Sequence, residues 1–583
     1  MKEGGLDKTK AFEKKVEIPK NVSHAVKMTG GRFIAETLKG YNVTHVFFVE
    51  AILRQALVEM EELGIRRVLT HSEKAAAYMA DGYARVSRRP GICMAQSVGA
   101  ANLASGLQDP YLGLSPVIAI TGRKPPIAQY RNAYQEILHG PMFDPVTKYN
   151  VIVETVDQLP YILRQAFREA TSGAPGPVHL DVTGFAGEVI AEAKAELEVL
   201  IEKPFIHYPS SRPEPEAELV REAVRALLSV ERPVIVAGGG AMASSAGPEI
   251  VELAERLSIP VATSLNGKGI ILESHPLSVG VVGSYSRWCA NRVVSEADMV
   301  IYIGSHTGDQ VTNGWTVPRQ GTPVIQIDID PLELGRNYPN TVGLMGDAKT
   351  TVRRFIECLS PHPKTNSRRW AQRAQQLVKE WQDELKPFRN SDATPIRPER
   401  LCKELTEVLP SNGILVSDTG YSAIWTGTMV YLTHPGQTYI RCAGSLGWGF
   451  PASLGVKCAA PDRPVVCFTG DGGFWYHLSE LETARRCGIR TVTVVNNNHC
   501  LGQCLDGINR AYGDKTGKRE EMCMFLDIDF AKIAQAMGCL GIRVENPGEI
   551  SAALKKALES DLPAVIDIAT DMECKAPNPW TPT

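Results

Sequence analysis

The stretch "VVCFTGDGGFWYHLSELETARRCGIRTVTVVNNNHCLGQ", residues 465–503, decides the fold. Its apolar run at 465–468 predicts a buried strand that ends at a GDG motif, and a helical stretch follows. A second apolar strand, at 491–495, ends at three consecutive asparagines. Two buried strands separated by a helix form a βαβ unit, the building block of parallel sheets. Because ligands bind beyond the carboxyl ends of such strands, we expect the aspartate and the asparagines to share one site.

Asp471 of the GDG motif and Asn498, 27 residues later, carry oxygen donors of the kind that a hard divalent cation prefers. Magnesium keeps phosphate oxygens in its remaining positions, so this pair predicts a magnesium–diphosphate site. The glycines Gly470, Gly472 and Gly473 allow the backbone to approach a diphosphate closely. The alternative is a DG turn followed by an asparagine-rich helix start, and either half of the motif alone favours that alternative.

Composition sets the class of protein. The chain has 583 residues, which is too long for one core and predicts about three or four domains. A net charge of −3 leaves no electrostatic footprint for nucleic acid or for an anionic membrane surface. The first residues lack the apolar core of a signal peptide, and no apolar run is long enough to span a membrane. Thirteen cysteines without paired spacing indicate reduced thiols, so we expect a cytoplasmic protein.

Strand-like apolar runs alternate with amphipathic helical stretches along almost the whole chain. This pattern predicts an α/β fold of three consecutive parallel-sheet domains. The predicted order is an N-terminal arm (1–27), a first domain (28–190), a middle domain (205–365), a third domain (395–572) and a C-terminal tail (573–583). The tail is either a lid over an entrance or a frayed end.

The spacing of the GDG motif and the asparagines resembles the thiamine diphosphate (ThDP) binding motif of the decarboxylase and acetohydroxyacid synthase superfamily. Other segments resemble the same superfamily in order and spacing. The segment at 69–91 is similar to its "HExxAxxxAxGYAR" element, 133–150 to its "FQE…PVTK" loop, and 444–473 to its "GTMGFGLPAAIGA…PD…GDG" stretch. The resemblance covers almost the whole chain and implies pyrimidine-binding, middle and diphosphate-binding domains of the ThDP-enzyme fold.

The resemblance also implies the roles of individual residues. Asp471 and Asn498 would bind Mg²⁺ through their side chains, and Cys500 through its backbone carbonyl. Leu446 would be the large apolar residue that bends the cofactor. The other residues that the resemblance places against the cofactor are Gly99, Asn102, Gly420, Tyr421, Ser422, Gly470, Gly472, Gly473, Leu501 and Gly502.

Glu73 is the predicted activator of the cofactor. In "LTHSEKAAAYMADGYARVSRRPG" it opens a helix directly after a strand-like run, and it matches the activating glutamate of the superfamily. A glutamate in a dry pocket has a raised pKa and can share its proton with the aminopyrimidine ring, which generates the thiazolium ylid. Read without the resemblance, Glu73 is an ordinary acid in the first turn of a helix. Gln135 matches the family position near the reacting centre.

The substrate is less clearly indicated. Where acetohydroxyacid synthases carry a "GxPGG" turn, this chain has Val49, Glu50 and Ala51, and Glu50 is either a second acid/base or a helix-start carboxylate. The triple asparagine resembles the oxalyl-CoA decarboxylase and 2-hydroxyacyl-CoA lyase branch. The sequence therefore favours a ThDP- and Mg²⁺-dependent 2-hydroxyacyl-CoA lyase. An acetolactate synthase-type enzyme acting on 2-oxo acids is the alternative, and a non-catalytic ThDP-fold binding protein is the alternative of another class.

Two further questions concern ligands and assembly. Basic residues at 510–519 either meet a CoA phosphate or form a solvated loop. Glycine-rich strand exits at 234–241 and 304–312 lie where relatives hold FAD, ADP or neither, and the sequence favours no tightly held flavin. Because the two halves of the ThDP site come from different subunits in relatives, the resemblance implies a homodimer or homotetramer.

Overall fold

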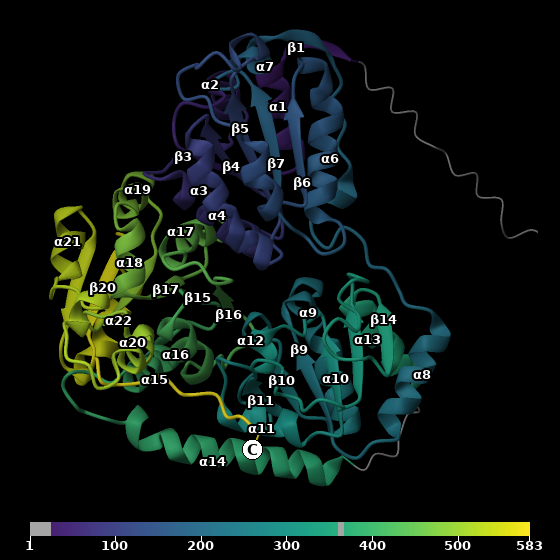
Figure 1. Cartoon of the computed structure of the whole chain (residues 1–583), viewed down its shortest axis with the longest axis vertical. Coiled ribbons are helices and arrows are strands. Elements are labelled where there is room, and N and C mark those ends of the chain that lie inside the picture. The colour runs from purple at the N-terminus through teal and green to yellow at the C-terminus, as the bar shows by residue number, and fades with distance from the viewer. Residues whose placement is uncertain (1–24, 360–366, 583) are drawn as a thin grey trace, which may run out of the picture.

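The computed structural model describes residues 25–359 and 367–582, and it contains three α/β blocks, each built on a six-stranded parallel sheet (Figure 1). This confirms the predicted fold class. Residues 1–24 of the predicted N-terminal arm lie outside the described residues, and the first described strand, β1, begins at Val26. Among the described residues, no helix combines the length and the apolar character that a membrane span requires.

The first block has the strand order β3-β2-β4-β5-β7-β6. The bounds of these strands are Arg66–Leu69, His45–Phe48, Gly91–Gln96, Val117–Arg123, Val178–Thr183 and Tyr149–Val153. The main helices around the sheet are α1 (Gly30–Gly40), α2 (Arg54–Glu62), α3 (Glu73–Ser87), α4 (Gly99–Leu112) and α6 (Leu159–Thr171). A short antiparallel pair, β1 (Val26–Thr29) with β8 (Lys194–Leu197), adjoins this block.

The middle block has the order β11-β10-β9-β12-β13-β14. Its strands are Ser278–Val281, Val261–Thr263, Pro233–Ala237, Met299–Ile303, Val324–Asp328 and Val342–Met345. Its helices include α8 (Ala217–Leu228), α9 (Gly239–Ser244), α10 (Gly247–Leu257), α11 (Trp288–Glu296), α12 (Asp309–Thr312) and α13 (Ala348–Cys358) (Figure 1). The long polar helix α14 (Arg368–Arg389) runs beneath the middle and third blocks (Figure 1).

The third block has the order β16-β15-β17-β18-β20-β19. Its strands are Thr438–Arg441, Ile414–Ser417, Val465–Gly470, Val492–Asn497, Ala564–Ala569 and Leu540–Val544. Its main helices are α15 (Pro398–Val408), α16 (Tyr421–Met429), α17 (Gly449–Ala459), α18 (Asp471–Phe474), α19 (Glu480–Cys487), α20 (Leu505–Tyr512), α21 (Phe530–Ala536) and α22 (Ile550–Leu558). The βαβ unit predicted from 465–503 is therefore present: β17 and β18 are hydrogen-bonded neighbours.

Helices α3 and α17 join the first block to the third. A Cβ added at Gly82 would lie 2.2 Å from the carbonyl oxygen of Ala452, and one at Gly455 would lie 1.8 Å from that of Met79. Only glycine permits two helix backbones to approach so closely. The indole of Trp448 also donates a hydrogen bond of 2.9 Å to the buried carboxylate of Asp81. The first and third blocks are thus fixed relative to each other.

The C-terminal tail does not fray within the described residues. Asn291 of α11 donates a hydrogen bond of 2.9 Å to the carbonyl of Trp580, and Asn313 donates one of 3.1 Å to the hydroxyl of Thr581. The tail therefore leaves the third block and lies against the middle block, near the C label in Figure 1. Its role as a lid stays a prediction.

Candidate active site

Asp471 lies where β17 ends and α18 begins, and it is 3% exposed. Its Oδ1 accepts a hydrogen bond of 2.9 Å from the N–H of Gly472, whereas its Oδ2 is buried without a partner among the described residues. Burial raises the pKa of this carboxyl to about 7, and the N–H groups of Gly472, Cys500 and His499 lower it in part. A buried carboxylate oxygen without a partner is costly, and a cation would satisfy it.

The end of β18 meets Asp471, as the sequence predicts. The side-chain oxygen of Asn498 accepts a hydrogen bond of 3.2 Å from the N–H of Cys500. This local hydrogen bond holds together the loop that carries two of the predicted metal ligands. Asn497 has a structural role, because its amide donates hydrogen bonds to Asp567 and to the carbonyl of Ile528. Asp471, Asn498 and the Cys500 backbone therefore form a donor set of oxygens that fits Mg²⁺.

The predicted diphosphate residues come together at the same sheet edge. A Cβ added at Gly470 would lie 3.6 Å from the hydroxyl of Ser422, and one at Gly502 would lie 3.4 Å from the ring of Tyr421. Gly420, the N-cap of α16, has φ +67°, a backbone conformation that favours glycine. The ends of the neighbouring strands β15, β17 and β18 thus carry the predicted diphosphate residues side by side.

Gly472 and Gly473 are closely packed against neighbouring side chains, in addition to their predicted role in ligand approach. A Cβ at Gly472 would lie 2.5 Å from the side chain of Leu501, and one at Gly473 would lie 2.9 Å from the hydroxyl of Thr469. Leu446 is half-buried in the turn between β16 and α17, which is the location expected for the residue that bends the cofactor.

Asp418 is a buried residue of this site that the sequence analysis missed. Its carboxylate accepts hydrogen bonds from the N–H groups of Gly447 and Gly449 at 3.1 and 3.2 Å, so it holds the turn that carries Leu446. Burial raises the pKa of Asp418 to about 6. The available signal was an aspartate directly after a buried strand and two residues before a glycine, a pattern similar to that at Asp471.

The first-block set is centred on Glu73, the first residue of α3. The side-chain amide of Asn102 donates a hydrogen bond of 3.1 Å to Glu73 Oε2. A Cβ at Gly99 would lie 2.5 Å from Glu73 Oε1, so a larger residue at this position would displace the carboxylate from where it lies. The structure therefore brings together Glu73, Gly99 and Asn102, which the sequence predicts to meet the pyrimidine ring.

Gln135 lies in a loop beside this set, and Glu50 does not. The hydroxyl of Ser97 donates a hydrogen bond to the carbonyl of Gln135, and Gln135 Oε1 is buried without a partner among the described residues. Glu50 is exposed and forms an i, i+4 ion pair of 2.5 Å with Arg54. This pairing favours a surface carboxylate near the start of α2 over a second acid/base.

The first-block and third-block sets belong to separate networks. Within the described chain, no hydrogen bond or ion pair connects Glu73, Asn102 or Gln135 with the residues that surround Asp471. The resemblance nevertheless implies that one ThDP molecule contacts both sets.

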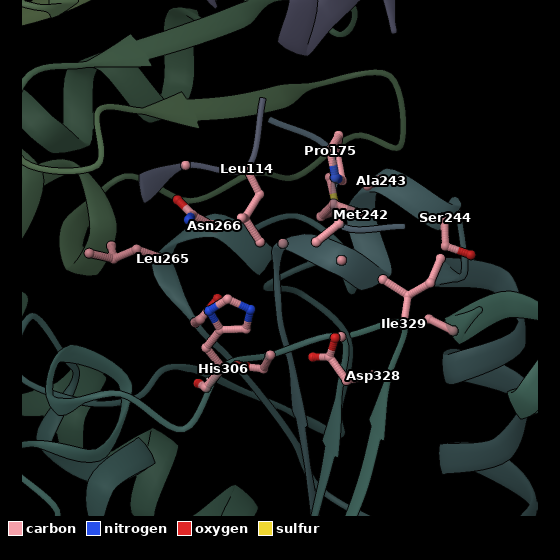
Figure 2. Close-up of a pocket in the computed structure, with 18 of the residues that line it drawn as sticks. Leu114, Pro175, Met242, Ala243, Ser244, Leu265, Asn266, His306, Asp328 and Ile329 are labelled. Carbon is pink, nitrogen blue, oxygen red and sulfur yellow. Dashed lines mark hydrogen bonds between the residues drawn. The ribbon is translucent and has the colours of Figure 1, made fainter. Parts of the chain in front are cut away.

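A cavity of about 670 Å³ lies where the three blocks meet, and residues of all three blocks line it (Figure 2). The predicted glycine-rich exits of β9 and β12 line it through Gly239, Gly240 and Gly304, together with Asp328 at the end of β13. Burial raises the pKa of the Asp328 carboxyl. The volume is within the usual range for small-molecule sites, and whether FAD or ADP binds here stays a prediction.

The fold and the two sets of residues define a ThDP-dependent enzyme. The chain belongs to the thiamine pyrophosphate enzyme family. It matches the N-terminal TPP binding domain over residues 28–142, the central domain over 220–355 and the C-terminal TPP binding domain over 418–568.

Several relatives of the chain are named as acetolactate synthases. The chain is 35% identical over 530 residues, 86% of its length and 85% of the relative's, to a probable acetolactate synthase large subunit of Methanococcus aeolicus. It is 34% identical over 565 residues (93% and 92%) to the corresponding protein of Methanocaldococcus jannaschii. It is 28% identical over 558 residues (94% and 95%) to the acetolactate synthase isozyme 1 large subunit of Escherichia coli. These names support the synthase alternative rather than the favoured 2-hydroxyacyl-CoA lyase interpretation.

Proposed function

We propose that the protein is an acetolactate synthase-type decarboxylase and carboligase of 2-oxo acids that uses ThDP and Mg²⁺. The observation that carries the cofactor assignment is the buried Asp471 oxygen, which lacks a partner where β17 and β18 meet. The relatives named above support the reaction class. When bound, ThDP supplies the electron sink for cleavage and formation of carbon–carbon bonds.

The side chains of the protein hold this cofactor and direct protons. Asp471 and Asn498 would bind the metal that neutralises the diphosphate, and the backbone around Gly420 and Gly470 would lie against the phosphates. Glu73, held by Asn102, would share its proton with the ring nitrogen of the aminopyrimidine. The retention of Glu73, Asp471 and Asn498 also argues against a non-catalytic binding protein.

The loop at 510–519 gives little support to the CoA alternative. Arg519 donates hydrogen bonds to the side chain of Asn509 and to the carbonyls of Gly513 and Lys515, and Lys518 pairs with Glu521 at 3.1 Å. Two of the basic side chains are therefore occupied within their own segment. This is what a self-contained surface loop does.

A homodimer, or a homotetramer built from dimers, is part of the proposal. The loop around Gln135 exposes large apolar side chains to an unusual degree: Ile127, Tyr130, Tyr134 and Leu138. Several exposed apolar side chains in one loop next to half of an active site are typical of a subunit interface. A second copy that covers this loop could bring its own Asp471 set to Glu73.

The deciding experiment offers the protein, with ThDP and Mg²⁺, a panel of 2-oxo acids and 2-hydroxyacyl-CoA thioesters, and identifies the products by mass spectrometry. We expect pyruvate to give carbon dioxide and 2-acetolactate. Cleavage of the thioesters without any reaction of 2-oxo acids would reject the synthase proposal and restore the lyase alternative.

A further inference from the structure

Asp109, an aspartate of the first block, holds a turn of the third block. It lies near the end of α4, and it is completely buried. Its carboxylate accepts hydrogen bonds of 2.9–3.2 Å from the N–H groups of three consecutive residues, Ala443, Gly444 and Ser445. Consecutive N–H groups that converge on one point form a concave site for an anion. The carboxylate of one block thus fixes the backbone of another.

Asp418 holds the same turn from the other side of Leu446. Its carboxylate accepts hydrogen bonds from the N–H groups of Gly447 and Gly449. Gly447 has φ +86°, a backbone conformation that favours glycine, so the chain bends directly after Leu446. Leu446 is therefore the residue that lies between two anchored stretches of backbone.

The side chain of Leu446 is held in place without being packed in a core. It is half-buried, and it belongs to none of the apolar clusters formed by the described residues. A leucine that serves the core is usually buried among other apolar side chains. At Leu446 the backbone sets the position of the side chain, and the side chain remains available for contact with a ligand.

The link between Asp109 and the turn is a charged one. Arg85 forms ion pairs with both Asp81 and Asp109, at 2.7 and 2.9 Å. Among the described residues, no second cation pairs with these two carboxylates, so the N–H groups of the turn supply the remaining positive partner. A hydrogen bond to an ionised carboxylate is stronger than a neutral one. Because Asp81 would keep Arg85 as its partner, Asp109→Asn removes the charged link and preserves an ion pair in the buried cluster.

We propose that Asp109 is a positioning residue of the reaction, an inference that rests on the proposed function. By holding the N–H groups of residues 443–445, it fixes how far Leu446 projects towards the cofactor. The bend of the bound cofactor would then be set by a residue of the first block that does not touch it. A displacement of about 1 Å at such a contact can cost on the order of 100-fold in rate.

A double-mutant cycle of Asp109→Asn and Leu446→Ala tests whether the two residues act together. The readout is proton–deuteron exchange at C2 of bound ThDP, which needs no substrate and depends on the bend because the bend brings the amine of the cofactor to C2. We expect each single variant to slow this exchange by about 10- to 100-fold, and the double variant to be no slower than the slower single variant. Losses that multiply in the double variant would mean that Asp109 acts independently of Leu446, for example through Asn102 on the same helix, and would overturn the proposal.

Amide hydrogen exchange of the full chain without cofactor tests the anchoring itself. We expect the peptide that contains residues 443–449 to exchange about 10-fold faster in Asp109→Asn, because its N–H groups lose a charged partner. Asp347→Asn is the matched control, since this buried carboxylate also pairs with an arginine, Arg212 at 3.0 Å, and accepts a hydrogen bond of 3.1 Å from a backbone N–H, that of Thr350. It should accelerate amide exchange around Thr350 and leave exchange at C2 unchanged. An unchanged 443–449 peptide in Asp109→Asn would overturn the proposal.

The outcomes separate this proposal from the proposed function. If the wild type exchanges the C2 proton but converts no 2-oxo acid, the synthase proposal fails, and a non-additive cycle would still support the role of Asp109. If 2-oxo acids are converted but the losses multiply, the synthase proposal stands and the positioning role is overturned. Calorimetry gives the last distinction. Asp109→Asn should bind ThDP and Mg²⁺ almost as the wild type does, because Asp471 and Asn498 are unchanged, and a loss as large as that of Asp471→Ala would assign Asp109 to the folding of the site and overturn the proposal.

Discussion

The side-chain amide of Asn102 donates a hydrogen bond of 3.1 Å to the carboxylate of Glu73. The two residues lie in the first turns of α3 and α4, which are packed against each other. With Gly99 leaving room for the other carboxylate oxygen, Glu73 is fixed from one side and open on the other. This is the arrangement expected of a group that exchanges a proton with a bound ring.

Replacement of Glu73 by Gln tests its role directly. The substitution keeps the size of the side chain and its hydrogen bond with Asn102, but removes the exchangeable proton. We expect proton–deuteron exchange at C2 of bound ThDP to slow by about 10²–10⁴-fold, the usual contribution of a positioned acid/base group. NMR after acid quench measures the exchange without a substrate. Glu482→Gln, which removes a nearby exposed carboxylate that binds His71, is the control; an unchanged rate in Glu73→Gln would assign activation to another residue.

The metal site predicts a loss of cofactor affinity in Asp471→Ala. Without this carboxylate, Mg²⁺ would lose the charged ligand that the proposal places between it and the end of β17. We expect calorimetry with ThDP and Mg²⁺ to show at least about a 100-fold weaker complex, the loss of one buried charged interaction. Asp527→Ala, which removes an exposed carboxylate opposite His499, should bind normally. Wild-type affinity in Asp471→Ala would contradict the site assignment.

The exposed loop around Gln135 predicts the assembly. Tyr134 is 75% exposed, and a charge at this position would be buried without a partner in the proposed interface. We expect Tyr134→Glu to shift the protein towards the monomer in light scattering and to reduce its specific activity. Tyr161→Glu, on α6 with 69% exposure, should leave the assembly unchanged. An active monomeric wild type at the assay concentration would reject the dimer.

Local pattern and long-range contact explain what the sequence could and could not predict. The three α/β blocks and the meeting of Asp471 with the loop after β18 follow from alternation and strand-end motifs, which are local signals. The sequence left the role of Glu50 open, because a second acid/base and an ordinary surface carboxylate can both lie at a helix start. Its pairing with Arg54 is seen only in the structure. The contacts of Asp109 and of Asp418 join residues far apart in the chain, and no periodicity encodes such contacts.

A buried ion cluster between the middle and third blocks is another such contact. Glu273 is paired with both Lys268 and Arg287, and it accepts a hydrogen bond from the N–H of Leu432. Lys268 is 1% exposed. One carboxylate thus serves two buried cations, which leaves the cluster with one positive charge too many.

This imbalance predicts a specific pH dependence. Burial lowers the pKa of Lys268 from 10.5 to about 8, in spite of Glu273. Between these values the unfolded chain still holds the proton that the folded chain has released, so the contribution of Lys268 to stability rises with pH across that window. Below that pH window Lys268 is charged in the folded chain, and burial of this charge lowers stability. We therefore expect Lys268→Met to raise the free energy of unfolding at pH 7 by on the order of 1–3 kcal/mol, which raises Tm by a few degrees. This gain should vanish towards pH 10.

Glu273→Gln should have the opposite effect, because it leaves Lys268 and Arg287 buried without an anion. We expect a marked fall in Tm at pH 7 that becomes smaller as pH rises and Lys268 loses its proton. Differential scanning fluorimetry from pH 6 to pH 10 would follow both variants against the wild type. Since other titrating groups are common to all three proteins, they cancel in the differences. If Lys268→Met lowered Tm at pH 7 as much as Glu273→Gln does, Lys268 would be a needed partner of the carboxylate, and the excess-charge interpretation would be wrong.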